Sequence, residues 1–107
     1  MNRGEVWWIN FDPSVGGEIK KERPAVIVSN NAANRNLNRV QVVPLTSNTS
    51  RIYPSEALVT LQGRPSKAMA DQLTTVSKKR MRKKAGELTP EEIAAVELAV
   101  RVQLGLR

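Results

Sequence analysis

Residues 5–29 read EVWWINFDPSVGGEIKKERPAVIVS, two apolar runs of strand length on either side of a polar loop. The first run, residues 5–11, is rich in aromatic and β-branched side chains, and Asp12-Pro13 ends it, which is typical of a strand. The second run, residues 24–29, is continuously apolar and predicts a strand buried on both faces. Between the runs, residues 14–22 hold a Gly-Gly pair and four charges without periodicity, which predicts a mobile loop.

Three more short strands are predicted, at residues 40–45, 56–61 and 72–76. Pro44 in the first of them indicates an edge position or a bulge, and a turn is expected at residues 62–66. Residues 30–38 are rich in Asn, which favours a loop with room for one helical turn. Five short strands with tight connections favour a small curled sheet or barrel.

The pattern changes near the C-terminus, where several signals predict a helix over residues 90–104. Thr89 supplies an N-cap hydroxyl, Pro90 suits the first helical position, Glu92 completes a capping box, and Gly105 suits the C-terminal cap. The apolar positions expected on one face are Ile93, Val96, Val100 and Leu104. The chain is therefore expected to be one β-rich α+β domain over residues 1–107 with a packed C-terminal helix.

Composition excludes several kinds of site. The chain has no Cys and no His, which excludes disulfides, thiolate chemistry and histidine acid–base catalysis. Its acidic residues are scattered and no G-x-x-x-x-G-K-[ST] motif is present, which disfavours two-metal nucleases and nucleoside triphosphatases. No apolar run approaches the roughly 20 residues of a membrane span, so we expect a soluble, cytoplasmic protein.

The charge is unevenly distributed. The chain carries 17 Lys and Arg against 10 Asp and Glu, a net charge of +7, which suggests a polyanionic partner. Six of the cations form a basic run: Lys78, Lys79, Arg80, Arg82, Lys83 and Lys84. The rest of the chain is therefore nearly neutral.

One reaction needs neither a metal nor histidine: cleavage of RNA by attack of its own 2′-OH on the adjacent phosphate. The protein must then orient the phosphate and neutralise the charge that grows on its oxygens. Arg suits this role through its planar fork of donors, and a Thr hydroxyl can complete the phosphate contacts. Arg23 and Thr46-Ser47 stand at strand ends and are candidates. The residues alone favour the alternative, in which Arg23 pairs with Glu18 or Glu22 and Thr46 caps a turn.

Seven segments, in order along the chain, resemble the MazF/PemK toxins of bacterial toxin–antitoxin systems. They are RGEVWW at 3–8, FDP at 11–13, GE at 17–18, RPAVIVS at 23–29, VPLTS at 43–47, DQLTTV at 71–76 and LGL at 104–106. The resemblance implies an SH3-like β-barrel with helices, a homodimer, and an endoribonuclease that needs no metal or cofactor. It further implies cleavage of single-stranded RNA, such as mRNA, to a 2′,3′-cyclic phosphate, with a cognate antitoxin that masks the site.

The resemblance also implies roles for particular residues. Arg23 and Thr46 match the family's catalytic pair, and Glu18, Ser47 and Gln72 match positions kept near the substrate. Bases are expected to be read by the loops at residues 14–22 and 48–53. In the second loop Tyr53 is a candidate stacking residue, with a half-buried tyrosine at a strand start as the alternative.

Three questions stay open from the sequence. The basic run is compatible with a solvated face, with extra affinity for RNA backbone, or with docking of an acidic antitoxin tail. Trp7 and Trp8 are consecutive on a strand and should face opposite sides, one packed inside and one at a dimer, antitoxin or base-stacking surface. The alternative functions are a toxin of the same fold that poisons DNA gyrase without chemistry, and a catalytically silent nucleic-acid-binding barrel.

Overall fold

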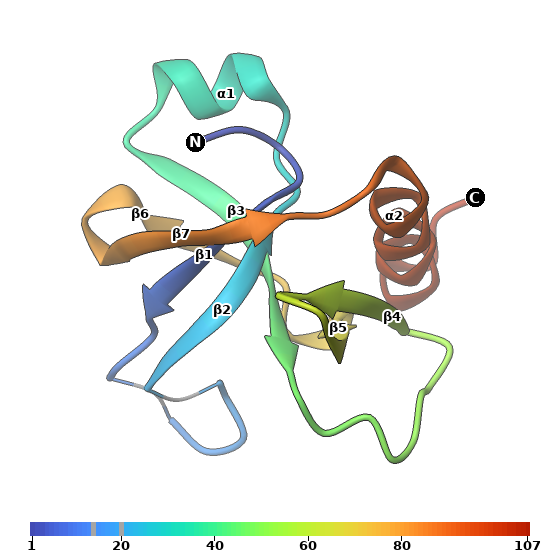
Figure 1. The fold of residues 1–107 in the computed structure, drawn as a ribbon. Helices are drawn as coiled ribbons and strands as arrows, with labels where there is room; N and C mark the ends of the chain where they lie inside the picture. The colour runs from blue at the N-terminus through green and yellow to red at the C-terminus, as the bar shows by residue number, and fades with distance from the viewer. Residues whose placement is uncertain (14, 20) are drawn as a thin grey trace.

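The computed structural model describes residues 1–13, 15–19 and 21–107, and it contains a curled sheet with two helices (Figure 1). The strands are β1 (Glu5–Asn10), β2 (Glu22–Ile27), β3 (Arg39–Thr46), β4 (Glu56–Leu61), β5 (Arg64–Met69), β6 (Thr74–Ser77) and β7 (Met81–Glu87). The helices are α1 (Asn31–Asn36) and α2 (Pro90–Leu104), with 3-10 turns at Ala70–Gln72 and Lys78–Arg80. None of the helices within these described ranges is both long and apolar enough to cross a bilayer.

The sheet follows the order β4-β5-β3-β2-β1-β7, and β6 pairs with β3 outside this path. All of these pairs are antiparallel. The two ends of the path approach each other, because the Gln62 Nε2 amide beside the β4-β5 turn donates to the Ala85 carbonyl of β7 at 3.1 Å. The sheet therefore curls into a half-barrel, which confirms the predicted β-rich fold with a C-terminal helix.

Alternation along the strands builds two apolar cores on opposite faces of the sheet. On β2, Val26 belongs to one cluster while Ala25 and Ile27 belong to the other, and all three are at most 2% exposed. The first cluster fills the space between the sheet and α2, to which Val96 contributes. The prediction that the centre of this strand is buried on both faces is confirmed.

Helix α2 begins with the predicted capping box. The Thr89 hydroxyl accepts a hydrogen bond from the Glu92 amide at 3.2 Å, and the Glu92 carboxylate accepts from the Thr89 amide at 2.9 Å. Gly105 closes the helix at a φ of 68°, which suits glycine. The expected apolar face is correct for Val96 but wrong for Leu104, which is 53% exposed because the face continues past the first core cluster.

The structure has two strands that the sequence did not predict, β5 and β7. β5 lies where a turn was expected at residues 62–66; the turn itself is only Gln62-Gly63, both at positive φ (52° and 77°), as a tight hairpin requires. β7 contains the second half of the basic run, Arg82, Lys83 and Lys84, and is held as an edge strand by β1.

The strand expected at residues 72–76 begins two residues later, at Thr74, because Gln72 closes a 3-10 turn. One helical turn was allowed within residues 30–38, and α1 occupies it.

Candidate active site

Arg23 and Thr46 meet at one end of the β2-β3 pair. In the ladder Ala25 lies opposite Pro44, and continuing that antiparallel register by two residues places Arg23 opposite Thr46. Both residues line a pocket of about 350 Å³, the β2-β3 pocket. Arg23 is partly buried there. The structure thus brings together the two residues that the resemblance pairs.

The β2-β3 pocket is lined by both apolar and polar side chains. Its lining consists of Trp8, Lys21, Glu22, Arg23, Pro24, Leu45, Thr46, Ser47, Leu61, Gln62, Arg64 and Ser66. Three of these side chains are cationic and one is a carboxylate, so the pocket carries an excess of positive charge. Guanidinium groups beside hydroxyls suit a phosphate, because both donate hydrogen bonds to its oxygens.

Thr46 ends β3 and begins a turn, as expected if this residue caps a turn. Its hydroxyl oxygen accepts a hydrogen bond from the Asn48 amide at 3.3 Å. This bond uses a lone pair of the oxygen and fixes the side chain while its hydrogen can still point to a phosphate. A turn-capping role and a phosphate-binding role for Thr46 are therefore compatible.

Tyr53 lies in the loop between β3 and β4, outside the β2-β3 pocket, and connects to it through Lys67. Lys67 stands directly opposite Thr46 on β5. Its ammonium is 5.7 Å from the centre of the Tyr53 ring and 3.0 Å from a Glu56 carboxylate oxygen. The guanidinium of Arg51 is 5.9 Å from the same ring. Tyr53 is 51% exposed and lies three residues before β4, so the half-buried tyrosine of the alternative interpretation stays open, while part of its ring is accessible.

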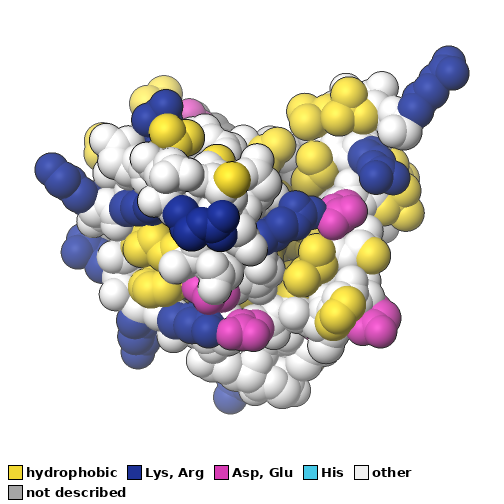
Figure 2. All heavy atoms as spheres, turned by 90° about the horizontal axis from the view of Figure 1, so that it is seen from above, with side chains coloured by type: hydrophobic (Ala, Val, Ile, Leu, Met, Phe, Trp, Pro, Cys, Tyr) yellow, Lys and Arg dark blue, Asp and Glu magenta, His cyan; other side chains and the backbone are white. Residues whose placement is uncertain are grey.

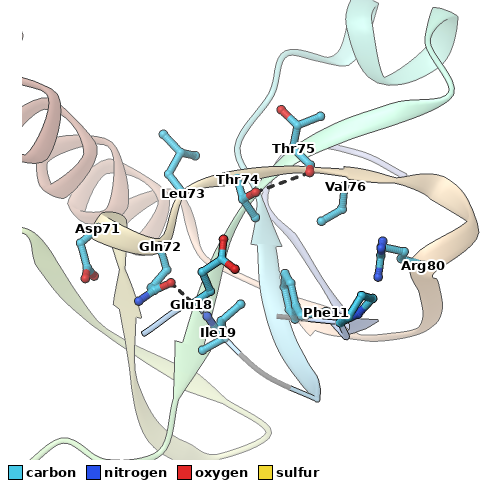
Figure 3. A pocket seen from close by; sticks show the side chains of 11 residues that line it. Phe11, Glu18, Ile19, Asp71, Gln72, Leu73, Thr74, Thr75, Val76 and Arg80 are labelled. Atoms are coloured by element: carbon cyan, nitrogen blue, oxygen red, sulfur yellow. Dashed lines mark hydrogen bonds between the residues drawn. The ribbon is translucent and has the colours of Figure 1, made fainter. Parts of the chain in front are cut away.

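Glu18 and Gln72 lie elsewhere, in a second pocket of about 350 Å³ that we call the β6 pocket (Figure 3). Its lining consists of Phe11, Pro13, Glu18, Ile19, Asp71, Gln72, Leu73, Thr74, Thr75, Val76 and Arg80. The structure therefore does not place Glu18 and Gln72 in the same pocket as Arg23 and Thr46, although the sequence grouped them.

Contacts of Glu18 and Gln72 order the loop between β1 and β2. The Gln72 amide accepts from the Ile19 backbone at 3.2 Å and donates to the Gly17 carbonyl at 3.3 Å. The Glu18 carboxylate accepts from the Val15 amide at 2.6 Å. Of the loop predicted to read bases, Ser14 and Lys20 lie outside the described residues.

Half of the basic run is tied to neighbouring elements. Lys78 donates to the Asn34 carbonyl, and Arg80 donates to the carbonyls of Asn10 and Asp12 at 3.1 and 2.5 Å. Lys84 is paired with Glu87 and Glu5.

The other three cations, Lys79, Arg82 and Lys83, are exposed, and their side chains make no hydrogen bond or ion pair within the described part of the chain. Seen from above, the Lys and Arg side chains are dispersed rather than gathered in one patch (Figure 2). The basic run is thus neither wholly structural nor wholly free.

Trp7 and Trp8 face opposite sides of β1, as predicted. Trp7 packs against the second core cluster, and its indole N–H donates to the Glu5 carboxylate at 2.9 Å. Burial alone would raise the pKa of Glu5, but this hydrogen bond and the nearby Lys84 contribute to a pKa below its usual value. Trp8 lines the β2-β3 pocket. The sequence could not show which of the two tryptophans would line the pocket. Alternation along a strand places them on opposite faces but does not show which face has the pocket.

Within residues 1–13, 15–19 and 21–107, no three Asp or Glu side chains cluster closely enough to suggest a metal site. The chemistry that the β2-β3 pocket can support from its own side chains is phosphate binding by guanidinium and hydroxyl groups.

Comparisons with known proteins agree with one another. The family described as PemK-like, MazF-like toxin of type II toxin–antitoxin system matches residues 2–104. Endoribonuclease MazF9 of Mycobacterium tuberculosis is 36% identical, over 99% of this chain and 98% of that protein. Endoribonuclease toxin MazF of Escherichia coli K12 is 33% identical, over 95% of this chain and 92% of that protein.

Solved structures of MazF and of a related endoribonuclease are also similar to this chain. MazF from Deinococcus radiodurans superposes with a TM-score of 0.87 at 27% identity, covering 99% of this chain and 97% of that one. A mycobacterial endoribonuclease in complex with its cognate antitoxin superposes with a TM-score of 0.84 at 29% identity, covering 100% of this chain and 97% of that one. The similarity covers the whole half-barrel and helix α2.

Proposed function

The chain belongs to the PemK/MazF family of type II toxin–antitoxin toxins and is an endoribonuclease, and we propose that it cleaves single-stranded RNA in the β2-β3 pocket. The observation that carries the proposal is the convergence of Arg23 and Thr46 on that pocket. Its excess of cationic side chains suits a phosphodiester, and its open shape suits an unpaired strand whose bases are splayed.

The proposed reaction uses the substrate's own nucleophile. The 2′-OH attacks the adjacent phosphorus, a P–O2′ bond forms, and the P–O5′ bond breaks. The products are a 2′,3′-cyclic phosphate and a 5′-OH end, with one proton leaving the 2′-OH and one reaching the 5′ oxygen. No metal or cofactor is needed to balance this step.

Arg23 would stabilise the negative charge of the pentavalent phosphorane, because its fork of donors can contact two phosphate oxygens at once. Thr46 and Ser47 would hold the phosphate through their hydroxyls. The bond from Val15 to the Glu18 carboxylate supports loop ordering as the role of Glu18 rather than proton transfer. Gln72 would act in the same way, by holding the loop that carries Gly17 and Ile19.

A direct test uses the purified chain, a long single-stranded RNA and EDTA. We expect discrete fragments that end in 2′,3′-cyclic phosphate and 5′-OH, with the same pattern when EDTA is omitted. Heat-denatured protein is the control for contaminating ribonucleases. Intact RNA, or cleavage that EDTA abolishes, would contradict the proposal.

We also propose two protein partners. The outer side of α2 exposes Leu98 and Val102, at 61% and 48%, and Figure 2 shows apolar side chains on this side of the molecule. An exposed apolar row of this kind suits a second copy of the chain in a homodimer. The relative solved with its cognate antitoxin supports an antitoxin as the second partner. Action on mRNA would place the toxin in the cytoplasm.

A further inference from the structure

Trp8 and Arg64 are among the residues of the β2-β3 pocket that have no role in the reaction proposed above. They reach the pocket from different walls. Trp8 is on β1, directly opposite Pro24 of β2 on one side and Lys83 of β7 on the other. Arg64 begins β5, opposite Leu61 at the end of the β4-β5 hairpin. The sequence could not predict that Trp8 and Arg64 line the same pocket, because β5 was not predicted as a strand.

The hairpin register shows which way Arg64 faces. Along β5, Arg64, Ser66 and Ala68 alternate with outward positions, and Ala68 is fully buried in the first core cluster. Arg64 is therefore on the inward face of the hairpin. It is also the first residue of β5, beside the hairpin turn, and its side chain is exposed instead of being buried.

The end of the β4-β5 hairpin contacts β7. The Gln62 side chain bonds the Ala85 carbonyl at 3.1 Å, and a Leu61 methyl lies 3.5 Å from where a Cβ on Gly86 would be. The hairpin end thus lies against β7, the strand that pairs with β1. Trp8 and Arg64 consequently border one cavity, which a single nucleotide could bridge.

The charges of the pocket indicate which kind of ligand could contact both Trp8 and Arg64. The lining holds three cations, Lys21, Arg23 and Arg64, and one carboxylate, Glu22. One guanidinium, Arg23, is used by the scissile phosphate. Arg64 makes no side-chain hydrogen bond or ion pair within the described residues, so its five donors are open to a ligand. A second guanidinium in one pocket suits a second phosphate of the same strand.

We propose that Trp8 and Arg64 hold the nucleotide next to the scissile phosphate, Trp8 by stacking on its base and Arg64 by contacting its phosphate. The inference rests on the proposed ribonuclease function. Aromatic stacking accepts every base, so this nucleotide adds affinity and alignment more than sequence selection. Arg64 is a positioning residue, and its loss acts on KM rather than on the rate of the bound complex.

The test for Arg64 uses an RNA that the protein cleaves, synthesised with 2′-deoxyribose at the cleaved nucleotide so that it binds without reacting. Dissociation constants are measured over a range of salt concentrations for wild type, Arg64→Gln and Arg35→Gln. Arg35 is a matched control, because it is exposed on α1 and makes no side-chain bond within the described residues. We expect Arg64→Gln to weaken binding about tenfold and lower the log–log salt slope by about 0.7, as expected when one phosphate is no longer neutralised.

The test for Trp8 uses fluorescence. The chain has two tryptophans, so Trp7→Phe leaves Trp8 as the sole indole, and the uncleavable RNA should quench it in a saturable way. Trp8→Phe should keep more affinity than Trp8→Leu, because it keeps an aromatic face. A melting scan of each variant shows whether it is folded.

Three outcomes would overturn the inference while leaving the ribonuclease intact. They are equal salt slopes for Arg64→Gln and Arg35→Gln, an unchanged Trp8 spectrum on binding, or, in steady-state cleavage of the unmodified RNA, a loss in Arg64→Gln that falls on kcat alone. Failure of the proposed function looks different, since the wild type would then cleave no RNA at all. The two failures are therefore distinguishable.

Discussion

Arg23 and Thr46 occupy the same end of two adjacent antiparallel strands and line one pocket, with Arg23 two residues beyond Ala25 and Thr46 two residues beyond Pro44, the last cross-strand pair. Both side chains are thus held by strand backbone rather than by a loop. A site on rigid elements is positioned before its substrate arrives, which is how charge stabilisation works best. This geometry leads to the first prediction.

Arg23→Ala and Thr46→Ala should each slow RNA cleavage by about 10² to 10³, the usual cost of removing one donor from a developing oxyanion. Arg23→Lys should recover only part of the rate, since it restores the charge but not the planar fork. Thr46→Ser should recover more, because it restores the hydroxyl. The measurement is single-turnover cleavage at saturating RNA.

Arg35→Gln serves as the matched control for charge, and it should cleave at the wild-type rate. Full activity in a folded Arg23→Ala protein would contradict the assignment of the pocket. A loss of rate in Thr46→Ala that Thr46→Ser does not restore would indicate a steric rather than a hydroxyl role.

The sequence predicted local features well and long-range ones poorly. The α2 capping box depends on Thr89 and Glu92 alone, three residues apart, so it could be predicted. The opposition of Arg23 and Thr46 depends on the β2-β3 register, which no local pattern specifies. Both residues were therefore identified as candidates through the family resemblance, but the sequence could not predict that they lie next to each other.

Dependence on long-range strand pairing also explains why β5 and β7 were not predicted and why the predicted site residues lie in two pockets. β5 reads RPSKAM and β7 reads MRKKAGE, neither with the alternation of a strand; tight-turn geometry and pairing with β1 make them strands. Glu18 and Gln72 were grouped with Arg23 because all three match family positions. In the structure those two face the β6 pocket, because β6 pairs with residues 39–42 at one end of β3, whereas β5 pairs with Leu45 and Thr46 at its other end.

The second prediction concerns the basic run. Lys79, Arg82 and Lys83 have no ion-pair partner among the described residues. Replacing all three by Gln should reduce the log–log salt slope of RNA binding, by up to about 0.7 for each phosphate that is no longer neutralised, with little change in stability. Replacing the three tied cations, Lys78, Arg80 and Lys84, should instead lower the melting temperature. An unchanged salt slope in the first triple variant would show that the exposed cations form only a solvated face.

The third prediction concerns Tyr53, whose exposed ring lies beside Lys67, the residue opposite Thr46. If a base stacks there, Tyr53→Ala should weaken binding of uncleavable RNA by about 1–3 kcal/mol, the usual value for one stacked base. Tyr53→Phe should bind like wild type, because the ring remains. Equal losses in the two variants would point to the hydroxyl, which accepts from Arg51 at 3.3 Å, and would rule out stacking as the main contribution.

The fourth prediction concerns α2. If Leu98 packs against a second copy, Leu98→Lys should shift the protein from dimer to monomer in light scattering at micromolar concentration, because a charge would be buried in an apolar interface. Arg101→Gln, which changes an exposed polar position on the same helix, should leave the dimer intact. A wild-type monomer, or a Leu98→Lys dimer of unchanged affinity, would contradict the proposed interface.

The fifth prediction concerns Glu92, which ties α2 to the sheet. Besides the capping box, its second carboxylate oxygen accepts from the Thr60 amide of β4 at 2.6 Å. Burial alone would raise the pKa of Glu92, but the hydrogen bonds from Thr89 and Thr60 outweigh it and lower that pKa. Glu92→Gln should therefore reduce the free energy of unfolding at pH 7 by about 1 kcal/mol, a typical loss for a helix cap.

The sign of the pH dependence follows from that lowered pKa. The folded state favours the ionised carboxylate, so the stabilisation from Glu92 is complete above its ordinary pKa of 4.5 and is lost as the pH falls through the lower folded value. Denaturant titrations at fixed protein concentration should show wild type and Glu92→Gln converging in stability over this acidic range. Glu91→Gln removes the same charge from the same helical turn without either bond, so it should cost only a few tenths of a kcal/mol. The difference in free energy of unfolding between wild type and Glu92→Gln could instead stay constant down to about pH 3. That result would mean that the substitution costs packing rather than charge-assisted hydrogen bonds.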